Sequence, residues 1–346
     1  MGAVAADRRP TLPVGKLPAK LLARLLAEVP VADPRVLVGP GVGLDCAVLD
    51  MGGGRCLVAK SDPITFAADE IGWYAVQVNA NDVATTGAEP RFFLATVLLP
   101  EGGTDEGLAE AILRQIRSAC AEVGAELVGG HTEITHGLGR PVVAGTMLGE
   151  VERERLVLPT GARPGDSLIL TKRLAVEATA ILAREKAVAL AGRVDARVLE
   201  RARGFLRSPG IGVLRDARAA LAAARVHAMH DPTEGGLATG LLELAQASGV
   251  GLEIEDTVPC YPETRALCAA FGIDPWGVIA SGSLLVSVAP EDAEAVVSSL
   301  AAAGVEGRVI GRVEDAAHGV LRREAGRVVP VPRFERDEIA KAFGSA

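Results

Sequence analysis

The sequence predicts a two-domain α/β protein. Its 346 residues are enough to form two separate cores. In both halves of the chain, short apolar runs of strand type alternate with longer runs of helical period. A segment rich in Pro and Gly at 159–166 (PTGARPGD) lies between the halves. We therefore expect one domain at residues 1–158 and a second at 159–346.

Composition and charge narrow the classes of function. The net charge is -8, with no block of basic residues, so no nucleic-acid partner is expected. No apolar run reaches the roughly 18 residues of a membrane span, and no apolar segment follows Arg8 and Arg9. The five cysteines form no CxxC pair, which favours reduced, buried thiols. We expect a cytoplasmic protein without a membrane partner.

The first half begins with an amphipathic helix at 16–29, followed by a series of strands with two further helices. Thr104 is the predicted N-cap of the second of these, with acidic residues in its first turn. The expected strands are 36–38, 47–49, 57–61, 91–99, 126–128 and 142–151, and the expected helices start near 68 and span 104–123.

The second half repeats the alternation of strands and helices. Strands are expected at 167–171, at a segment ending in His230, and at 250–255 and 278–288. Helices are expected at 176–184, 212–224, from 235, at 263–271 and at 291–303.

The central stretch of the chain is 62–90, DPITFAADEIGWYAVQVNANDVATTGAEP. A strand leads to Asp62, and the next helix carries Asn79 and Asp82 three residues apart, so both side chains lie on one helical face. A solvated polar face is one interpretation. Small apolar neighbours favour a buried helix instead, where an aspartate needs a partner and a cation is the usual one. Lys60, next to this stretch, is either a salt-bridged lysine or a phosphate ligand.

A glycine-rich turn precedes the stretch, GPGVGLDCAVLD at 39–50. Gly39, Gly41 and Gly43 allow positive φ and a close approach of the backbone to a ligand, and Asp45 follows them. A simple hairpin is the alternative interpretation. The turn is neither a Walker loop nor a Rossmann fingerprint, because no Gly-Lys-Ser/Thr and no helix follow the glycines.

Two later turns carry polar groups at the ends of strands, where α/β proteins place ligands. The first, GGHTEIT at 129–135, offers Gly129, Gly130, His131, Thr132 and Glu133. His131 is either a satisfied turn histidine or a group for phosphate contact or proton transfer.

The second turn follows His230, which is read as the end of its strand or as a functional group. Asp231 lies at the strand tip, and Thr233 precedes Gly235 and Gly236, which open a helix whose N-terminal amides could hold an anion.

Four aspartates therefore lie at the ends of strands or on the central helix: Asp45, Asp62, Asp82 and Asp231. If they converge, they cannot all ionise without a cation, since neighbouring carboxylates raise one another's pKa. Hard oxygen ligands favour Mg²⁺, which commonly bridges carboxylates and substrate phosphates. The glycine turns would supply backbone amides to those phosphates. The pattern predicts a nucleoside triphosphate site.

Five motifs in this order, GVGLDCAVLD, SDPITF, NANDVATTGAEP, GGHTE and HDPTEGGL, resemble the aminoimidazole ribonucleotide synthetase superfamily. This superfamily also contains selenophosphate synthetase, thiamine-monophosphate kinase and the hydrogenase maturation (expression/formation) protein E. The resemblance extends from about Gly15 to Arg323. HDPTEGGL and NANDVATTGA are most similar to the hydrogenase maturation branch.

The resemblance implies a two-domain PurM-like fold and a homodimer in which strands of the N-terminal domains form a barrel. ATP with Mg²⁺ would lie in the cleft between the domains, the metal held at Asp45, Asp62, Asp82 and Asp231. The acceptor of the phosphoryl group would be a carbonyl-type oxygen on a small molecule or on a protein. The candidate catalytic residues are Lys60, His131 and Glu133, and the candidate phosphate ligands are Gly41, Gly43, Asn79, Gly129, Gly130, Thr132, Thr233, Gly235 and Gly236.

Four departures from the superfamily pattern alter the expectation. The maturation branch carries its carbamoyl group on a C-terminal cysteine, whereas the last cysteine here is Cys268, so that self-modification is not expected. Leu44 replaces the first Asp of an Asp-Asp pair, and His131 stands where several branches have an acid. The catalytic Cys or selenocysteine and Lys of the selenophosphate enzymes are absent from 34–40.

The sequence thus predicts an ATP- and Mg²⁺-dependent phosphoryl-transfer enzyme with an unidentified acceptor. A small-molecule kinase of the thiamine-monophosphate kinase type and a nucleotide-binding scaffold without turnover are the two alternatives.

Overall fold

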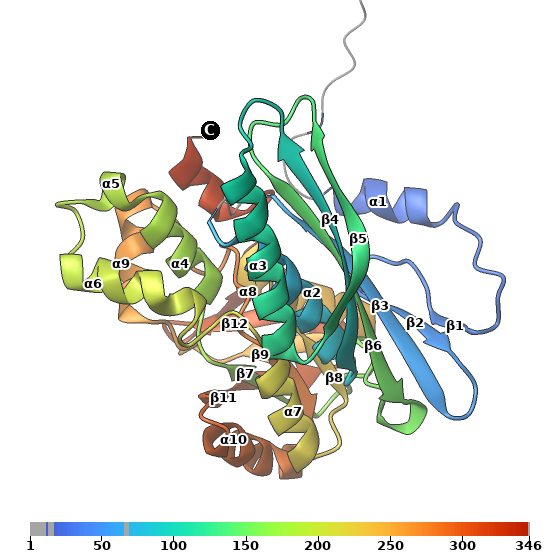
Figure 1. The fold of residues 1–346 in the computed structure, drawn as a ribbon. Coiled ribbons are helices and arrows are strands. Elements are labelled where there is room, and N and C mark those ends of the chain that lie inside the picture. Colours follow the sequence, from blue (N-terminus) through green and yellow to red (C-terminus); the bar gives the residue numbers. More distant parts are fainter. Residues whose placement is uncertain (1–11, 13–16, 66–68, 345–346) are drawn as a thin grey trace, which may run out of the picture.

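Two β-sheets, each built from one half of the chain, organise the molecule (Figure 1). The computed structural model describes residues 12, 17–65 and 69–344. Helices and strands alternate along both halves, which confirms the predicted mixed α/β class. A domain boundary between residues 158 and 159 stays a prediction.

The first sheet has six strands in the order β1-β2-β3-β6-β4-β5. All neighbouring pairs are antiparallel except β4 and β5, so β5 is a parallel edge strand. The strands are β1 (Val36–Val38), β2 (Ala47–Asp50), β3 (Arg55–Ile64), β4 (Glu89–Pro100), β5 (Glu126–Thr135) and β6 (Val142–Glu152). β5 runs straight through 129–135, so the predicted turn there is wrong.

Two helices, α2 (Ile71–Thr85) and α3 (Glu106–Val123), cover one face of this sheet (Figure 1). α2 is buried along almost its whole length, as its small apolar residues predict. Gly72 lets the two helices approach, because a Cβ there would lie 2.6 Å from the Ile112 carbonyl oxygen. The N-cap of α3 is Asp105, which accepts a hydrogen bond from the Leu108 amide, and not Thr104, whose hydroxyl donates to the Pro100 carbonyl.

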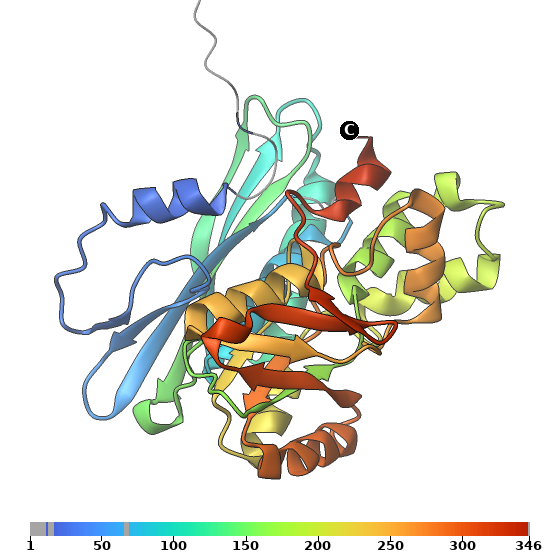
Figure 2. The same cartoon turned by 180° about the vertical axis from the view of Figure 1, so that it is seen from behind.

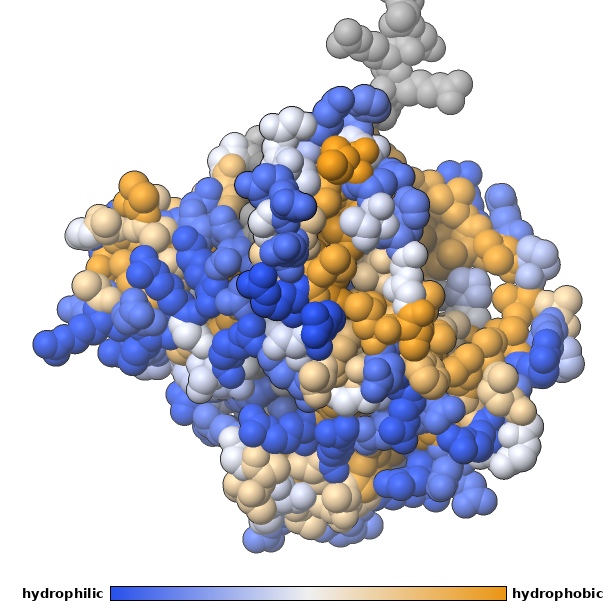
Figure 3. Space-filling model, in the orientation of Figure 1, coloured by the Kyte–Doolittle hydropathy of each residue, from blue (hydrophilic) through white to orange (hydrophobic). Residues whose placement is uncertain are grey.

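The opposite face of the first sheet is not covered by α2 and α3. α1 (Ala19–Leu26) lies beyond it in Figures 1 and 2, and part of the predicted helix at 16–29 falls outside the described residues. Apolar side chains gather over the strands of this sheet in Figure 3, where the surface is hollowed. We call this surface the open face. Half-buried Leu57, Leu94 and Leu98 belong to it.

The second sheet has seven strands in the order β13-β12-β9-β11-β7-β10-β8, antiparallel except for β12 with β9. They are β7 (Ser167–Thr171), β8 (Ala228–His230), β9 (Gly251–Ile254), β10 (Leu285–Val288), β11 (Gly307–Glu314), β12 (Val320–Glu324) and β13 (Arg327–Pro330). The expected strand at 278–288 is therefore shorter than predicted, and β11, β12 and β13 were not predicted.

Seven α-helices accompany the second sheet within the described residues: α4 (Val176–Glu185), α5 (Ala187–Leu190), α6 (Ala196–Arg203), α7 (Leu214–Ala223), α8 (Gly236–Ser248), α9 (Pro262–Phe271) and α10 (Ala293–Ala302). α4, α5, α6 and α9 form one group, and α7 packs with α10 below the sheet (Figure 1). α5 and α6 were not predicted.

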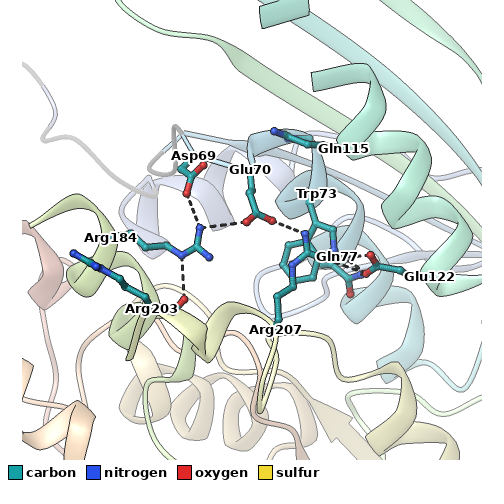
Figure 4. A network of polar contacts seen from close by, with 10 residues as sticks. Asp69, Glu70, Trp73, Gln77, Gln115, Glu122, Arg184, Arg203 and Arg207 are labelled. Atoms are coloured by element: carbon teal, nitrogen blue, oxygen red, sulfur yellow. Dashed lines mark hydrogen bonds and ion pairs between the residues drawn. The ribbon is translucent and has the colours of Figure 1, made fainter. Parts of the chain in front are cut away.

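The two halves are joined by polar contacts as well as by packing. The side-chain amide of Asn81, on α2, donates to the Ile211 carbonyl at 2.8 Å and accepts from the Val213 amide at 2.8 Å. Figure 4 shows a second connection, in which Arg184 and Arg207 from the second half reach Glu70 at the start of α2. These contacts fix α2 to the second half of the chain as well as to the first sheet.

No helix among the described residues is both long enough and apolar enough to cross a membrane.

Candidate active site

Three aspartates from both halves of the chain converge between the two sheets. Asp45 precedes β2, Asp82 lies on α2, and Asp231 follows β8. One carboxylate oxygen of each lies within 4.8 Å of those of the other two. Asp82 and Asp231 are buried, whereas Asp45 is half-buried. We call these three residues the acid cluster.

Lys60 connects the fourth predicted aspartate to the acid cluster. Its Nζ atom lies 2.9 Å from Oδ2 of Asp82 and 3.2 Å from Oδ2 of Asp62. The salt bridges expected for Lys60 are therefore present, and its contact with phosphate stays a prediction. Asp62 does not belong to the group of converging carboxylates, and its side chain is 40% exposed. Asp62 thus lies at the rim of the site.

Asn79 holds strand β3 against helix α2. Its Oδ1 atom accepts from the Asp62 amide at 2.9 Å, and its Nδ2 atom donates to the carbonyls of Asp62 at 3.2 Å and Ala75 at 2.8 Å. Gly145 faces it, because a Cβ at that position would lie 2.7 Å from Nδ2. The amide was expected to contact phosphate, but these bonds give it a positioning role, which fixes the Asp62 backbone.

A buried histidine holds the Asp45 side of the acid cluster. His230 Nδ1 lies 3.5 Å from Oδ2 of Asp45, and Nε2 lies 3.2 Å from Oε2 of Glu243 on α8. Burial alone would lower the pKa of His230, but the two carboxylates outweigh it and raise the pKa to about 10. His230 is therefore a cation at neutral pH. The sequence analysis missed Glu243, which no motif singles out.

Burial and repulsion disfavour ionisation of the other two aspartates. Burial is the main cause that raises the pKa of Asp82 to about 7, Asp45 and Asp62 add to it, and Lys60 opposes it. The pKa of Asp231 is raised well above its ordinary value, first by burial and then by Asp82 and Asp45. Both oxygens of Asp231 are buried without a hydrogen-bond partner among the described residues. Such a carboxylate is costly unless a cation neutralises it.

The acid cluster fits a hard divalent cation. It offers three carboxylates within reach of one ion, and the orphaned oxygens of Asp231 need a partner. Oxygen-only ligation from a few carboxylates is typical of Mg²⁺, which keeps waters and binds substrate phosphates with its remaining positions. Asp45, Asp82 and Asp231 would hold such an ion.

The glycine-rich turn at 39–43 links β1 to β2, and these strands pair as an antiparallel hairpin. Gly43 has φ +78, whereas Gly39 and Gly41 do not have the positive φ that was expected. Gly41 instead makes room for Leu44, since a Cβ there would lie 2.6 Å from the Leu44 side chain. The hairpin alternative is correct, and the hairpin also delivers Asp45.

The backbone amides of the turn between β8 and α8 already donate hydrogen bonds to groups of the chain itself. The Gly235 N–H donates to Asp337 at 2.7 Å, and the Gly236 N–H donates to the Thr233 carbonyl at 3.0 Å. A carboxylate of the chain therefore already occupies the start of the helix, where an anion was expected. Gly235 has φ +81 and Gly236 has φ +68, so the glycines are needed to shape the turn.

The GGHTE motif lies on β5, at the far edge of the first sheet. His131 aligns with Pro63 of β3 across β4 and β6, about 14 Å away at ordinary strand spacing. Because successive residues of a strand face opposite sides, His131 and Glu133 point to the open face, whereas Lys60 and Asp62 face α2. Nε2 of His131 lies 3.1 Å from Oε2 of Glu133. Within one chain, this pair does not join the acid cluster.

The rest of that motif is also separate from the cluster. Gly129 and Gly130 pair with β4, and a Cβ on Gly130 would collide with the Ala95 backbone, 1.9 Å from its oxygen. Thr132 is exposed on the same strand.

Comparison with known proteins decides the family. The AIR synthase related protein, N-terminal domain, matches residues 43–151, and the AIR synthase related protein, C-terminal domain, matches residues 163–324. The chain belongs to the AIR synthase related family. Its two matched regions contain all three residues of the acid cluster.

This AIR synthase related chain is similar to several named proteins and solved structures. It is 32% identical over 296 residues to the carbamoyl dehydratase HypE of Cupriavidus necator, covering 81% of this chain and 80% of that protein. The structure of the hydrogenase maturation protein HypE in complex with ATP has a TM-score of 0.66 and 26% identity, covering 91% and 95%. AaThiL complexed with AMPPCP and TMP has a TM-score of 0.69 at 22% identity, covering 91% and 94%, and shows the fold alone.

Proposed function

We propose that this chain is an ATP-dependent enzyme of hydrogenase-maturation type, which transfers the γ-phosphoryl group of ATP to a carbonyl-type oxygen of an acceptor. One observation carries the proposal: the buried oxygens of Asp231 have no hydrogen-bond partner within the described part of the chain and lie beside Asp45 and Asp82. Its relatives include a carbamoyl dehydratase HypE and a HypE in complex with ATP, which supports the nucleotide and the reaction class.

Mg²⁺ at the acid cluster would neutralise charge on the transferring group, which is the chief catalytic contribution in phosphoryl transfer. The chain's own residues set up the site. Lys60 keeps its proton, because Asp82 and Asp62 outweigh burial and raise its pKa, so it offers positive charge to phosphate and does not act as a base. His230 also stays protonated and fixes Asp45.

A carbonyl-type oxygen carries no proton that a base must remove before it attacks phosphorus. Such an acceptor suits this site, because Lys60 and His230 are already protonated. His131 and Glu133 remain proposals for later proton transfer on an acceptor, since both are exposed on β5. Gly41, Gly43, Gly129, Gly130, Thr132 and Thr233 remain proposals for phosphate contact.

The acceptor is proposed to be external to the described residues. Cys46, Cys56, Cys120 and Cys268 are buried and Cys260 is half-buried. Burial raises the pKa of the Cys268 thiol to about 12 and that of Cys260 to about 11. No thiol in this part of the chain is therefore suited to carry the group that is phosphorylated.

A homodimer in a cytoplasmic location completes the proposal. The open face carries apolar residues, and β5 has strand neighbours on one side only. On β5, Val128 is 54% exposed and Ile134 is 61% exposed. A second copy that covers this face and this edge would bury the exposed apolar residues and protect the edge strand β5.

The test is a calorimetric titration with ATP, with and without Mg²⁺, followed by a phosphate-release assay. Wild type is compared with Asp231→Asn, which keeps the side-chain shape, and with Asp33→Asn, an exposed aspartate paired with Arg35 as a control. We expect Mg²⁺-dependent binding that is lost only in Asp231→Asn. No binding by wild type would overturn the proposal. Binding without phosphate release would indicate a scaffold, and a stable phosphorylated small molecule would indicate a kinase.

A further inference from the structure

A pocket of about 130 Å³ opens between the two halves, next to Asp62. Its polar lining comes from the end of β3 (Asp62) and the residue that follows β3 (Thr65), the start of α4 (Glu177), the turn before α8 (Thr233, Glu234) and the segment before β10 (Ser281). We call it the acidic pocket. Asp62 belongs to its wall and is joined through Lys60 to the acid cluster, so the two sites are neighbours.

The lining of the acidic pocket is electrostatically one-sided. Three carboxyl groups line it, those of Asp62, Glu177 and Glu234, and the described residues of its lining include no Lys, Arg or His. The remaining walls are apolar, formed by Pro63, Ile64, Val78 and Ile279 among others. A ligand with a negative charge would meet repulsion from all three carboxylates, whereas a cation would meet none.

One carboxylate oxygen of Glu177 lacks a partner among the described residues. The residue is 5% exposed, and its Oε2 atom is buried without a hydrogen-bond partner in the described part of the chain. Ser281 donates to the same carboxyl group, so Oε2 is the oxygen of Glu177 that has no hydrogen-bond donor in the described part of the chain. A buried carboxylate oxygen of this kind is stabilised by an N–H donor, and most strongly by a charged one.

A metal ion is a poor match for the acidic pocket. Among the described residues, the acid cluster is the group of acidic side chains whose ligand atoms come within 4.8 Å of one another, and Asp62, Glu177 and Glu234 do not form such a group. Carboxylates that lie further apart suit a larger cation, with several N–H groups that reach separate oxygens.

We propose that the acidic pocket binds an organic cation, an ammonium or guanidinium group, carried by the acceptor of the phosphoryl group. This inference rests on the proposed function, because it assigns the neighbouring pocket to the acceptor. Glu177 and Glu234 would hold the cationic nitrogen group, and the acceptor oxygen would lie toward Asp62 and the acid cluster. Acceptors that carry a phosphate or carboxylate at this position are disfavoured.

The pH dependence of binding follows from the groups around Glu177. Burial raises the pKa of Glu177 to about 7, Ser281 opposes the shift, and Asp337 adds to it. Asp62 and Glu234 face the same space from β3 and from the turn before α8. A cation favours the ionised form of Glu177, so binding is expected to be tighter at pH 8 than at pH 6 and to release a proton near pH 7.

The experiment is a calorimetric or NMR titration of the full chain, without ATP, with methylguanidinium, methylammonium and acetate at constant ionic strength. Glu177→Gln is the variant. Glu263→Gln is the control, because Glu263 is also buried in the second half but pairs with Arg201 and does not line the pocket. We expect the two cations to bind wild type and the control alike, and Glu177→Gln about tenfold more weakly, as for a lost charged hydrogen bond.

Equal binding of acetate and of the cations, binding unaffected by Glu177→Gln, or no binding of either cation would each overturn the proposal. A short peptide with one arginine is titrated alongside methylguanidinium. If the peptide binds more tightly, the cation belongs to a protein acceptor. If free methylguanidinium binds more tightly, the cation belongs to a small molecule. Either result supports the proposal that the pocket binds an organic cation. Binding of ATP with Mg²⁺ is measured on the same samples. A failure of the proposed function is then distinguished from a failure of the acidic pocket to bind a cation.

Discussion

The Nζ atom of Lys60 lies 2.9 Å from Oδ2 of Asp82, and this ion pair joins strand β3 to helix α2 inside the candidate active site. Both side chains are largely buried, with 11% and 4% of their surface exposed. Removing one partner of a buried pair leaves the other charge without compensation. The site is therefore expected to tolerate loss of Lys60 only where Asp82 can take up a proton.

Lys60→Met is expected to lower the free energy of unfolding by about 3 kcal/mol at pH 8 and by less at pH 6, because Asp82 becomes neutral more readily in acid. Chemical denaturation without Mg²⁺ at the two pH values measures this. Lys20→Met, at an exposed lysine of α1, serves as the control and should change stability at neither pH. An equal loss at both pH values would contradict the assigned role of Asp82.

The Mg²⁺-free protein is expected to lose stability as pH rises from 6 to 8. The folded pKa of Asp82, about 7, lies above the ordinary 3.8, so the folded state binds the extra proton and stability falls as that proton leaves. From Asp82 alone the loss is on the order of 1 kcal/mol. His230 acts in the same direction, since its stabilisation is complete below pH 6.5 and is lost as pH rises through about 10.

Mg²⁺ is expected to reverse this trend, because an ion in the acid cluster favours ionised carboxylates and displaces their protons. Thermal unfolding at pH 6 and pH 8, with and without Mg²⁺, measures both effects. A larger stabilisation by Mg²⁺ at pH 6 than at pH 8 would exclude the acid cluster as the binding site.

Asp231→Asn is expected to stabilise the Mg²⁺-free protein at pH 8 while removing the stabilisation by Mg²⁺. The wild-type carboxylate is buried with both oxygens unpartnered, so a neutral amide of the same shape lowers the cost of burial. Urea denaturation with and without Mg²⁺ gives both values. Destabilisation without the ion would show that Asp231 has a structural partner.

Asn79→Ala is expected to cost about 2 kcal/mol of stability, since the Asp62 amide and two carbonyls lose their partner at once. ATP affinity should fall with it, because the Asp62 backbone is no longer fixed. Asn79→Asp separates the two effects: it keeps the acceptor for the Asp62 amide and removes the donor. Unchanged ATP binding in Asn79→Ala, with stability lowered, would limit Asn79 to folding.

The sequence predicted the elements whose signals are local. α2, which carries Asp82, is recognisable because small apolar residues surround its polar ones. Asp45, Asp62 and Asp231 lie in or beside strands that their neighbours define. The hairpin of β12 and β13 was missed because its strands are short, mix apolar with charged residues and contain no buried residue. β5 was cut short at Gly129 and Gly130, although Gly130 continues the strand with φ +145, since two glycines usually mark a turn.

Contacts between distant segments account for the residues that sequence reasoning missed. Glu243 matters because α8 brings it to His230, and Glu177 because α4 faces β3 across the junction of the halves. Neither residue belongs to a motif. The predicted turn at the end of a strand indicated that His131 and Glu133 lie among ligand groups, but both belong to β5, whose pleat turns them to the open face.

The contact of Asn81 with Ile211 and Val213 has a consequence for how the molecule responds to its ligands. Asn81 and Asp82 are adjacent on α2, so one turn of helix carries both a bond between the halves and a carboxylate of the acid cluster. Any shift of the second half that moves Asp231 away from Asp82 must also break the Asn81 bonds. Binding of the cation and the association of the two halves are thus expected to be thermodynamically coupled, so that each strengthens the other.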